Sequence, residues 1–539
     1  MSENDPSEAA GGTAARRPNR TRGSVSLQTA FDVLLILLFA ACLTAPMLGV
    51  FVGMDLRSGA EDEKRELATF PTWEWKSKTA RAFPGKFDAW FQDRFGLRRL
   101  LIRGHSLLSF YVLHTSPSPK VIIGKDGWLY YDGLPASDGD PINEYRGNPP
   151  LTPYQLERWR WMFEDVSDAL HERNIRFLLT LVPAKEQIYP EYMPDYLTPV
   201  GESANVQISR YLTERGRFEF LDLRPALLAA RQEERLYMRT DTHWNAYGAY
   251  VGYRSILGQL AAWYPRLQPW PLSDFELIKT TYLAGDLGQM MDLRRVMHED
   301  AIGLIPLKPR HANVQQQGDR DLADIISETG DTNLPRAVIF RDSFAVDLIP
   351  YLSEHFNRAF YKWSRLGIEM KPIEQEKPDI VLHILADRIL GRGLRYPTSM
   401  QIRASERRFA VSTNILAIVH RVGPLHDASV DLGDNGDIIV HAQGYQPTVE
   451  LPVIPDAKRY MPIVRMEVSA PARTVATIAW TSRIPSPTRM EINADLARGS
   501  NTVYFPLMDP EMTGPLRLNI GTQKGDYTVH AIEVRGFPR

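Results

Sequence analysis

The chain is almost free of cysteine. Its 539 residues include one cysteine, Cys42, which lies inside an apolar run near the N-terminus. A single cysteine excludes an intrachain disulfide and any metal site built from several thiolates. The fold must therefore rest on packing alone, even in an oxidising compartment.

Two further absences exclude whole classes of function. The 63 lysines and arginines nearly balance the 65 aspartates and glutamates, and a net charge of −2 gives no sign of nucleic-acid binding. The 12 histidines form no cluster with metal-ligand spacing, and there is no glycine-rich nucleotide-binding loop. We therefore expect no metal ion, no cofactor and no nucleic-acid partner.

One long apolar run is present near the N-terminus. No residue from Val33 to Met54 is charged, and about 20 apolar residues are enough to cross a bilayer. Four arginines lie between residues 16 and 22, and acidic residues outnumber basic ones after the run. The positive-inside rule then predicts a disordered cytoplasmic tail over 1–30, an anchor over 31–54 and a body outside the cytoplasm. A cleaved signal peptide is the competing interpretation.

From Thr152 the pattern alternates helices with apolar strands. Thr152-Pro153 is typical of a helix start, and that helix is predicted to run to about residue 173. Further helices are predicted over 245–263 and 343–355, and strands over 176–182, 218–223, 337–340 and 380–385. Continuous apolar strands separated by helices predict an α/β fold with a mainly parallel sheet covered on both faces.

After about Gly423 the pattern changes again. Short alternating segments are separated by Gly, Pro and Asn turns, which predicts a β-sandwich over 424–539. Trp480, Tyr504 and Tyr527 are candidates for a sugar-binding platform. The same aromatic residues would also be typical of a sandwich core.

Two short segments contain the parts of a hydrolase or acyltransferase triad. Asp241-Thr242-His243 precedes a predicted helix, and Ser343 follows a predicted strand. Serine needs an imidazole to take its proton, and the imidazole needs a carboxylate to fix its tautomer. In an extended loop, residues two apart point to the same side. Ligands of parallel sheets bind at the carboxyl ends of the strands, so both segments are predicted to share one site.

Each triad residue has a structural alternative. Ser343 or the adjacent Asp342 could cap the helix that follows, and Asp241 could cap the helix that begins near Asn245. His243 could bond a nearby carbonyl. If the triad exists, the backbone N–H of Ser343 is the best oxyanion donor, because a helix N-terminus favours negative charge. The candidates for substrate or oxyanion contact are Arg341, Lys185, Trp244 and Phe344.

Together these segments resemble the alginate O-acetyltransferase family of the AlgX/AlgJ type, which has an SGNH hydrolase-like fold. The resemblance covers about residues 60–395. Its matching pieces are Glu66-Leu67-Ala68 with Pro71, Gly124-Lys125-Asp126-Gly127-Trp128-Leu129, Val182-Pro183-Ala184-Lys185-Glu186, Asp241-Thr242-His243-Trp244-Asn245, Gly285-Asp286-Leu287 and Asp342-Ser343-Phe344. It implies a flavodoxin-like SGNH catalytic domain over 55–423 with a permuted triad order, in which Asp-x-His precedes Ser.

The resemblance also implies a function. Ser343 would be the nucleophile, His243 the base and Asp241 its orienting carboxylate. The protein would be a single-pass inner-membrane O-acetyltransferase whose periplasmic domain moves acetyl groups onto hydroxyls of a secreted polysaccharide. A membrane-bound O-acyltransferase would supply the acetyl group, and the sandwich looks like a carbohydrate-binding module. Two alternatives remain open: a polysaccharide O-acetyl esterase, and a non-catalytic polysaccharide-binding scaffold of a secretion complex.

Overall fold

A computed structural model describes residues 27–52, 68–71, 77–94, 97–133, 140–317, 322–364, 367–392, 398–433, 435–484 and 487–539. The chain divides into two compact units, Met1–Leu108 and Ser109–Arg539. Most of the predicted tail over 1–30 lies outside the described residues, and so does all of Glu66-Leu67.

The first unit contains the helices α1 (Leu27–Val52), α3 (Ser77–Arg94) and α4 (Arg98–Leu107), and η1 (Leu108–Val112) follows α4. Among the described residues, α1 is the one helix long and apolar enough to cross a membrane, with an 18-residue span over Gln28–Ala45. This helix coincides with most of the predicted anchor at 31–54. The direction in which it would cross a membrane stays a prediction.

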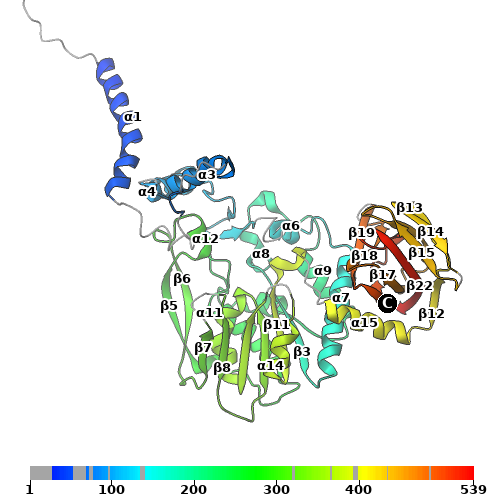
Figure 1. Cartoon of the computed structure of the whole chain (residues 1–539). Coiled ribbons are helices and arrows are strands. Elements are labelled where there is room, and N and C mark those ends of the chain that lie inside the picture. The colour runs from blue at the N-terminus through cyan, green and yellow to red at the C-terminus, as the bar shows by residue number, and fades with distance from the viewer. Residues whose placement is uncertain are drawn as a thin grey trace, which may run out of the picture. The chain divides into compact units, whose positions relative to one another are not determined.

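A seven-stranded sheet forms the centre of the α/β domain (Figure 1). Its order is β4 (Glu219–Asp222), β3 (Arg176–Val182), β11 (Ile380–Ala386), β9 (Arg336–Arg341), β10 (Arg358–Trp363), β8 (Asp324–Glu328) and β7 (Asn313–Gln317). The first five strands run parallel, and β8 and β7 add an antiparallel edge. The sequence analysis missed β10, β8 and β7. Every residue of β7 is exposed, so this strand carries no apolar pattern.

Helices cover both faces of the sheet because the strands are apolar on both sides. Ala337 and Ile339 of β9 join one core with α10 (Arg224–Ala230), α11 (Ala246–Leu260) and α13 (Ile349–Leu352). Val338 and Phe340 join a second core with α7 (Pro153–His171), α9 (Ala204–Arg215) and α14 (Met370–Glu376). Successive strand residues point to opposite faces, so the continuous apolar run of β9 supplies both cores.

Smaller elements complete this domain. Ser343 begins η5 (Ser343–Leu348), which continues into α13 and η6 (Ser353–His355), so the predicted helix over 343–355 is built from three short pieces. The remaining elements are β1 (Val121–Ile123), β2 (Leu129–Tyr131), α6 (Pro141–Arg146), α8 (Lys185–Ile188), η2 (Pro190–Tyr192), η3 (Asp195–Leu197), η4 (Leu272–Asp274), β5 (Phe275–Leu283), α12 (Asp286–Met290), β6 (His298–Pro306), η7 (Asp387–Arg392) and α15 (Thr398–Val411).

The C-terminal region is a β-sandwich of two antiparallel sheets. One sheet contains β14 (Ala428–Leu432), β15 (Ile438–Ala442), β22 (Gly525–Pro538), β17 (Tyr460–Ala470) and β20 (Gly499–Pro506), and β12 (Asn414–Ile418) also pairs with β22. The other contains β13 (Gly423–His426), β16 (Thr448–Val453), β21 (Met512–Asn519), β18 (Thr474–Ser482) and β19 (Thr488–Leu496). The sandwich therefore begins at β12, somewhat before the predicted boundary at 424.

The sandwich core contains two of the three aromatic residues considered for sugar binding. Trp480 and Tyr527 are buried, and the Trp480 indole N–H donates to Asp509 Oδ2 at 2.8 Å. Tyr504 is half-buried and its ring lies 5.7 Å from that of Phe409. These contacts assign Trp480 and Tyr527 to packing rather than to an open sugar-binding face.

Candidate active site

Three neighbouring strands end at the same edge of the sheet. β3 leads to Lys185, β11 to Arg388 and β9 to Ser343. Because parallel strands present their carboxyl ends together, three segments far apart in the sequence meet there. This edge is where the predicted site residues gather.

Two aspartates tie these strand ends together. Asp342, after β9, accepts a hydrogen bond at Oδ2 from the N–H of Ala386 at 2.7 Å. Asp387, after β11, accepts one at Oδ1 from the N–H of Ala184 at 2.8 Å. Both side chains are buried, so the end of β9, which leads to Ser343, is joined to β11, and β11 is joined in turn to β3.

Asp342 also caps the helical segment that Ser343 begins. Its Oδ1 accepts the N–H of Phe344 at 2.9 Å, which leaves the Ser343 hydroxyl available for other contacts. Phe344 is fully buried, and its ring lies 4.8 Å from the His243 ring. The expectation that Phe344 contacts substrate is therefore corrected: its N–H is occupied and its ring packs beneath the histidine.

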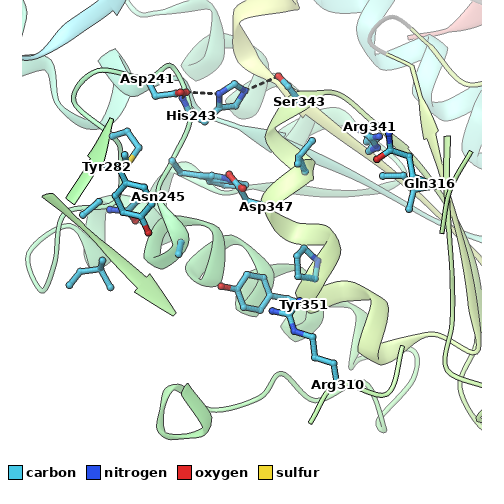
Figure 2. A pocket seen from close by; sticks show the side chains of 18 residues that line it. Asp241, His243, Asn245, Tyr282, Arg310, Gln316, Arg341, Ser343, Asp347 and Tyr351 are labelled. Atoms are coloured by element: carbon cyan, nitrogen blue, oxygen red, sulfur yellow. Dashed lines mark hydrogen bonds and ion pairs between the residues drawn. The ribbon is translucent and has the colours of Figure 1, made fainter. Parts of the chain in front are cut away.

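Asp241, His243 and Ser343 form one chain of hydrogen bonds (Figure 2). The Nδ1–H of His243 donates to Asp241 Oδ1 at 2.7 Å, and the Ser343 hydroxyl donates to His243 Nε2 at 2.8 Å. The side chains of His243 and Asp241 are 23% and 22% exposed, so the site is reachable from solvent. The sheet thus brings together two segments that are 100 residues apart.

Backbone N–H groups and a close glycine also hold the Asp241 carboxylate in place. Its Oδ1 also accepts the N–H of His243, and its Oδ2 accepts the N–H of Asp286, both at 2.9 Å. A Cβ at Gly285 would lie 2.1 Å from Asp241 Oδ2, so only glycine permits this close approach. The helix cap of α11 is Asn245 and not Asp241, which removes one of the alternatives left open by the sequence.

Burial and charge act in opposite directions on this pair. Burial lowers the pKa of His243, but the hydrogen bond and charge of Asp241 raise it more, and the net direction is upward. Burial raises the pKa of Asp241, but its bonds to His243 and to backbone N–H groups lower it well below the usual range. Asp241 therefore stays ionised at neutral pH and favours the charged imidazolium.

Lys185 supports the loop rather than a substrate. It is 2% exposed, and its Nζ donates to the carbonyl oxygens of Met238 and Arg239 at 3.0 Å and of Asp241 at 2.7 Å. Three acceptors use all the donors of an ammonium group. Burial lowers the pKa of Lys185 to about 8. The expectation of a substrate contact is corrected, because this side chain positions the segment that carries Asp241.

Trp244 and Arg341 are both buried. Trp244 is 2% exposed and stands edge-on to Phe344 at 5.7 Å, so most of its ring packs in the core, yet it also lines the pocket and its contact with substrate stays a prediction. Arg341 donates from Nη2 to the carbonyl of Ala323 at 2.9 Å, while its Nε has no partner among the described residues. Burial lowers the pKa of Arg341. Arg341 still lines the pocket, and its contact with substrate stays a prediction.

The structure adds two residues that the sequence analysis did not consider as site residues. Arg388 donates from Nη2 to Ser343 Oγ at 3.2 Å. Asp286 accepts the N–H of Thr242 at 2.7 Å and its hydroxyl at 2.6 Å, and burial followed by the charge of Asp241 raises the pKa of Asp286. Arg388 follows a strand that was predicted, so its position at a strand's carboxyl end was the available signal.

A pocket of about 600 Å³ opens beside the triad. Asp241, His243 and Ser343 lie along one side of it, and Asp347, Tyr351 and Arg310 line it farther from the triad (Figure 2). Asp347 is exposed to the pocket, yet the protein around it restricts its hydration and raises its pKa to about 6. A pocket of this size lies within the range of small-molecule ligand sites.

Residues 121–358 match the family described as "SGNH hydrolase-like domain, acetyltransferase AlgX". The probable alginate O-acetylase AlgJ of Pseudomonas syringae pv. tomato is 28% identical over 220 residues, which are 40% of this chain and 51% of that protein. AlgJ of Pseudomonas aeruginosa is 28% identical over 163 residues, 30% of this chain and 38% of that protein. Over residues 121–358 the α/β domain is similar to the AlgX/AlgJ-type family, in agreement with the resemblance seen in the sequence. The chain spans about half the length, or less, of these curated relatives.

Solved structures are also similar to this chain. The O-acetyltransferase domain of Pseudomonas putida AlgJ is 16% identical, with a TM-score of 0.36, and covers 52% of this chain and 98% of its own. Pseudomonas aeruginosa AlgX is 13% identical, with a TM-score of 0.34, and covers 77% of this chain and 94% of its own.

Asp241, His243 and Asp286 also place three potential metal-ligand atoms within 4.8 Å of one another. The hydrogen bonds already described account for this arrangement. His243 gives Nδ1–H to Asp241 and takes the Ser343 proton at Nε2, while both Asp286 oxygens accept from Thr242. The cluster therefore fits a hydrogen-bonded triad with a supporting carboxylate.

Proposed function

We propose that this chain is an O-acetyltransferase that moves acetyl groups onto the hydroxyls of a secreted polysaccharide. The observation that carries the proposal is the hydrogen-bonded chain Asp241–His243–Ser343 at the mouth of a 600 Å³ pocket. Supporting it, the matched relatives bear the name probable alginate O-acetylase.

In the first half-reaction, Ser343 Oγ attacks the carbonyl carbon of an acetyl ester. The hydroxyl proton passes to His243 Nε2, and Asp241 stabilises the imidazolium that forms. The tetrahedral intermediate then collapses, the leaving alcohol takes the proton from His243, and acetyl-Ser343 remains. The backbone N–H of Ser343 has no intrahelical acceptor at the start of η5, so it is a donor for the developing oxyanion.

In the second half-reaction, a sugar hydroxyl takes the place of the departed alcohol. It gives its proton to His243 Nε2 and attacks the carbonyl carbon of acetyl-Ser343. The Ser343–acyl bond breaks, and the proton returns from His243 to Ser343 Oγ. Water in the same position would make the protein an esterase, so the outcome depends on which nucleophile the large pocket holds.

We also propose that the domain works in the periplasm, tethered to the inner membrane by α1. The arginines before α1 support this orientation through the positive-inside rule. A periplasmic enzyme needs an acetyl donor that reaches it across the membrane. A membrane-bound O-acyltransferase is the partner class that would supply it.

The test uses the full chain in detergent micelles with an aryl acetate and a set of oligosaccharides. We expect acetate release, acetyl-Ser343 in the intact mass, and acetylated oligosaccharide when the acceptor is added. Ser343→Ala should lose all three. Ser343→Thr keeps a hydroxyl at this position and serves as a control for folding.

The outcomes separate the competing functions. Deacetylation of acetylated polymer without acetylation of bare oligosaccharide would favour the esterase. Acetate release by Ser343→Ala at the wild-type rate would show that Ser343 is not the nucleophile. Normal polymer acetylation in cells that carry His243→Ala would favour the non-catalytic scaffold over both enzymes.

A further inference from the structure

We propose that Arg388 is a catalytic residue that stabilises negative charge on the Ser343 oxygen itself in both half-reactions. This inference rests on the proposed function and deepens it. The guanidinium of Arg388 donates from Nη2 to Ser343 Oγ at 3.2 Å. Oγ is the atom that attacks when acetyl-Ser343 forms, and it is also the atom that leaves when the acetyl group moves on. One charged donor on this atom can therefore serve both steps.

The contact also fixes the direction of the Ser343 hydroxyl hydrogen. A serine hydroxyl has one hydrogen to donate and two lone pairs, whereas a guanidinium can only donate. Arg388 occupies one lone pair, so the hydroxyl hydrogen cannot point toward it. The hydrogen points instead to His243 Nε2, which lies 2.8 Å from Oγ. The second lone pair of Oγ stays available to attack a carbonyl carbon.

Arg388 reaches Ser343 without occupying the large pocket. That pocket is lined by His243 and Ser343, and Arg388 is not among its lining residues. The guanidinium carbon lies 5.3 Å from the centre of the Phe344 ring and 5.8 Å from that of Tyr131. An acetyl donor or a sugar hydroxyl can therefore approach Oγ from the pocket while Arg388 stays in contact with it.

The backbone around Arg388 is held, and its charge is available. The preceding Asp387 is buried and accepts from the Ala184 N–H at 2.8 Å and from the Asn205 amide at 3.1 Å. Among the described residues, Arg388 forms no ion pair with a carboxylate. Burial raises the pKa of the nearby Glu186 to about 7, so even this neighbour is only partly ionised at neutral pH. The positive charge of Arg388 can therefore act on Oγ.

The bond changes show where this charge is needed. In the first half-reaction the O–H bond of Ser343 breaks as its proton moves to His243 Nε2, and Oγ forms a bond to the acetyl carbon. In the second, the bond between the acetyl carbon and Oγ breaks, and its electron pair stays on Oγ until His243 returns the proton. Oγ carries more negative charge in both transition states than in the resting hydroxyl. A preformed charged donor therefore stabilises these transition states more than the resting state.

The experiment uses the full chain in micelles and follows acetyl-Ser343 by intact mass after mixing with p-nitrophenyl acetate. Arg388→Ala should slow both the formation and the loss of acetyl-Ser343 by about 10²-fold or more, as removal of one donor does. Arg388→Lys keeps a positive charge and should lose less. Arg215→Ala is the matched control, because its guanidinium also stacks on a tyrosine, 5.4 Å from the ring centre of Tyr211, but lies at the exposed end of α9. It should leave both rates unchanged.

Chemical rescue separates a catalytic charge from a structural one. A low, non-denaturing concentration of guanidinium chloride should restore much of the lost rate to Arg388→Ala and none to Ser343→Ala. A folded Arg388→Ala protein with both rates close to wild type would overturn the proposal. Equal losses in Arg388→Ala and Arg388→Lys that guanidinium does not relieve would overturn it too. If wild-type Ser343 is never acylated, the proposed function itself fails, which is a different result from normal acylation in Arg388→Ala.

Discussion

The Asp241 carboxylate accepts three hydrogen bonds, and one of them comes from the imidazole Nδ1–H of His243. An asparagine has the same shape, but its amide nitrogen donates hydrogen bonds and cannot accept one. We therefore expect Asp241→Asn to keep the fold and to cut the acylation rate by orders of magnitude, since the tautomer of His243 is no longer fixed. Single-turnover acylation with an aryl acetate measures this.

The matched control for that variant is a change that leaves the tautomer fixed. Asp286→Asn alters a neighbouring carboxylate that accepts from Thr242 rather than from the ring. Its effect should be much smaller. An acylation rate for a folded Asp241→Asn protein within about threefold of wild type would show that Asp241 serves structure only.

The pH dependence also belongs to the residue scale. His243 must be neutral to accept the Ser343 proton, so activity falls as the pH drops through its pKa. Asp241 outweighs burial and raises that pKa, so the acid limb of kcat/KM should lie above the reference value of about 6.5. Asp241→Asn should move the limb to lower pH.

Asp347, which lines the same pocket as His243, also titrates near this range. Burial raises the pKa of Asp347 in the pocket to about 6. Asp347→Asn distinguishes the two groups, because the acid limb should stay in place if His243 is responsible. An acid limb that disappears in Asp347→Asn would contradict the assignment to His243.

At the scale of elements, the segment before α11 is held from two strands. Lys185, after β3, bonds three of its carbonyl groups, and Glu299 of β6 accepts the N–H groups of Arg239 and Thr240 at 2.6 and 2.9 Å. The backbone of Asp241 is thus fixed from outside its own loop. Triad geometry depends on these anchors and not only on the triad side chains.

We expect Lys185→Met to lower both stability and activity. The methionine fills similar space but leaves three carbonyl oxygens without their donor, at a cost of about 2–4 kcal/mol in the free energy of unfolding. Thermal unfolding and kcat/KM of the full chain measure the two effects. Lys125→Met, at a lysine that is 45% exposed, is the control and should change neither. Unchanged kcat/KM in Lys185→Met would show that the loop keeps its shape without this anchor.

At the scale of the whole second unit, an arginine on α15 joins the α/β domain to the sandwich. Arg408 pairs with buried Asp165 of α7, and its guanidinium carbon lies 4.4 Å from the Trp161 ring and 5.7 Å from that of Phe537 in β22. The cluster around it also contains Phe409, Met461 and Met508. Residues of both folds therefore share one buried contact.

Arg408→Ala should destabilise this unit by about 1–3 kcal/mol, because it removes the partner of Asp165, whose pKa burial raises to about 7 even beside the arginine, so that the group can take up a proton. Denaturant unfolding of the full chain measures the loss. The double variant Asp165→Asn with Arg408→Leu removes both charges and should recover much of the stability. A single Arg408→Ala variant as stable as wild type would show that Asp165 is not charged in the folded protein.

The sequence correctly predicted the helices and strands whose pattern lies within the element itself. The strand at 176–182 coincides with β3, because a buried parallel strand is one unbroken apolar run. The helix start at Thr152-Pro153 is confirmed by a capping box between Thr152 and Gln155. The edge strand β7 has no apolar pattern, and its pairing with β8 depends on a neighbour that the local sequence does not reveal.

The same distinction between local and long-range information applies to the site residues. Residue type and spacing, together with the resemblance to the AlgX/AlgJ type, indicated Asp241, His243 and Ser343 in the sequence. The placement of Lys185, Trp244 and Phe344 was decided by burial and by backbone acceptors, which no local pattern reports. Arg388 reaches Ser343 only because β11 lies between β3 and β9 in the sheet. Sequence by itself determined which chemical groups exist and which local elements carry them, while long-range strand order alone decided which groups meet.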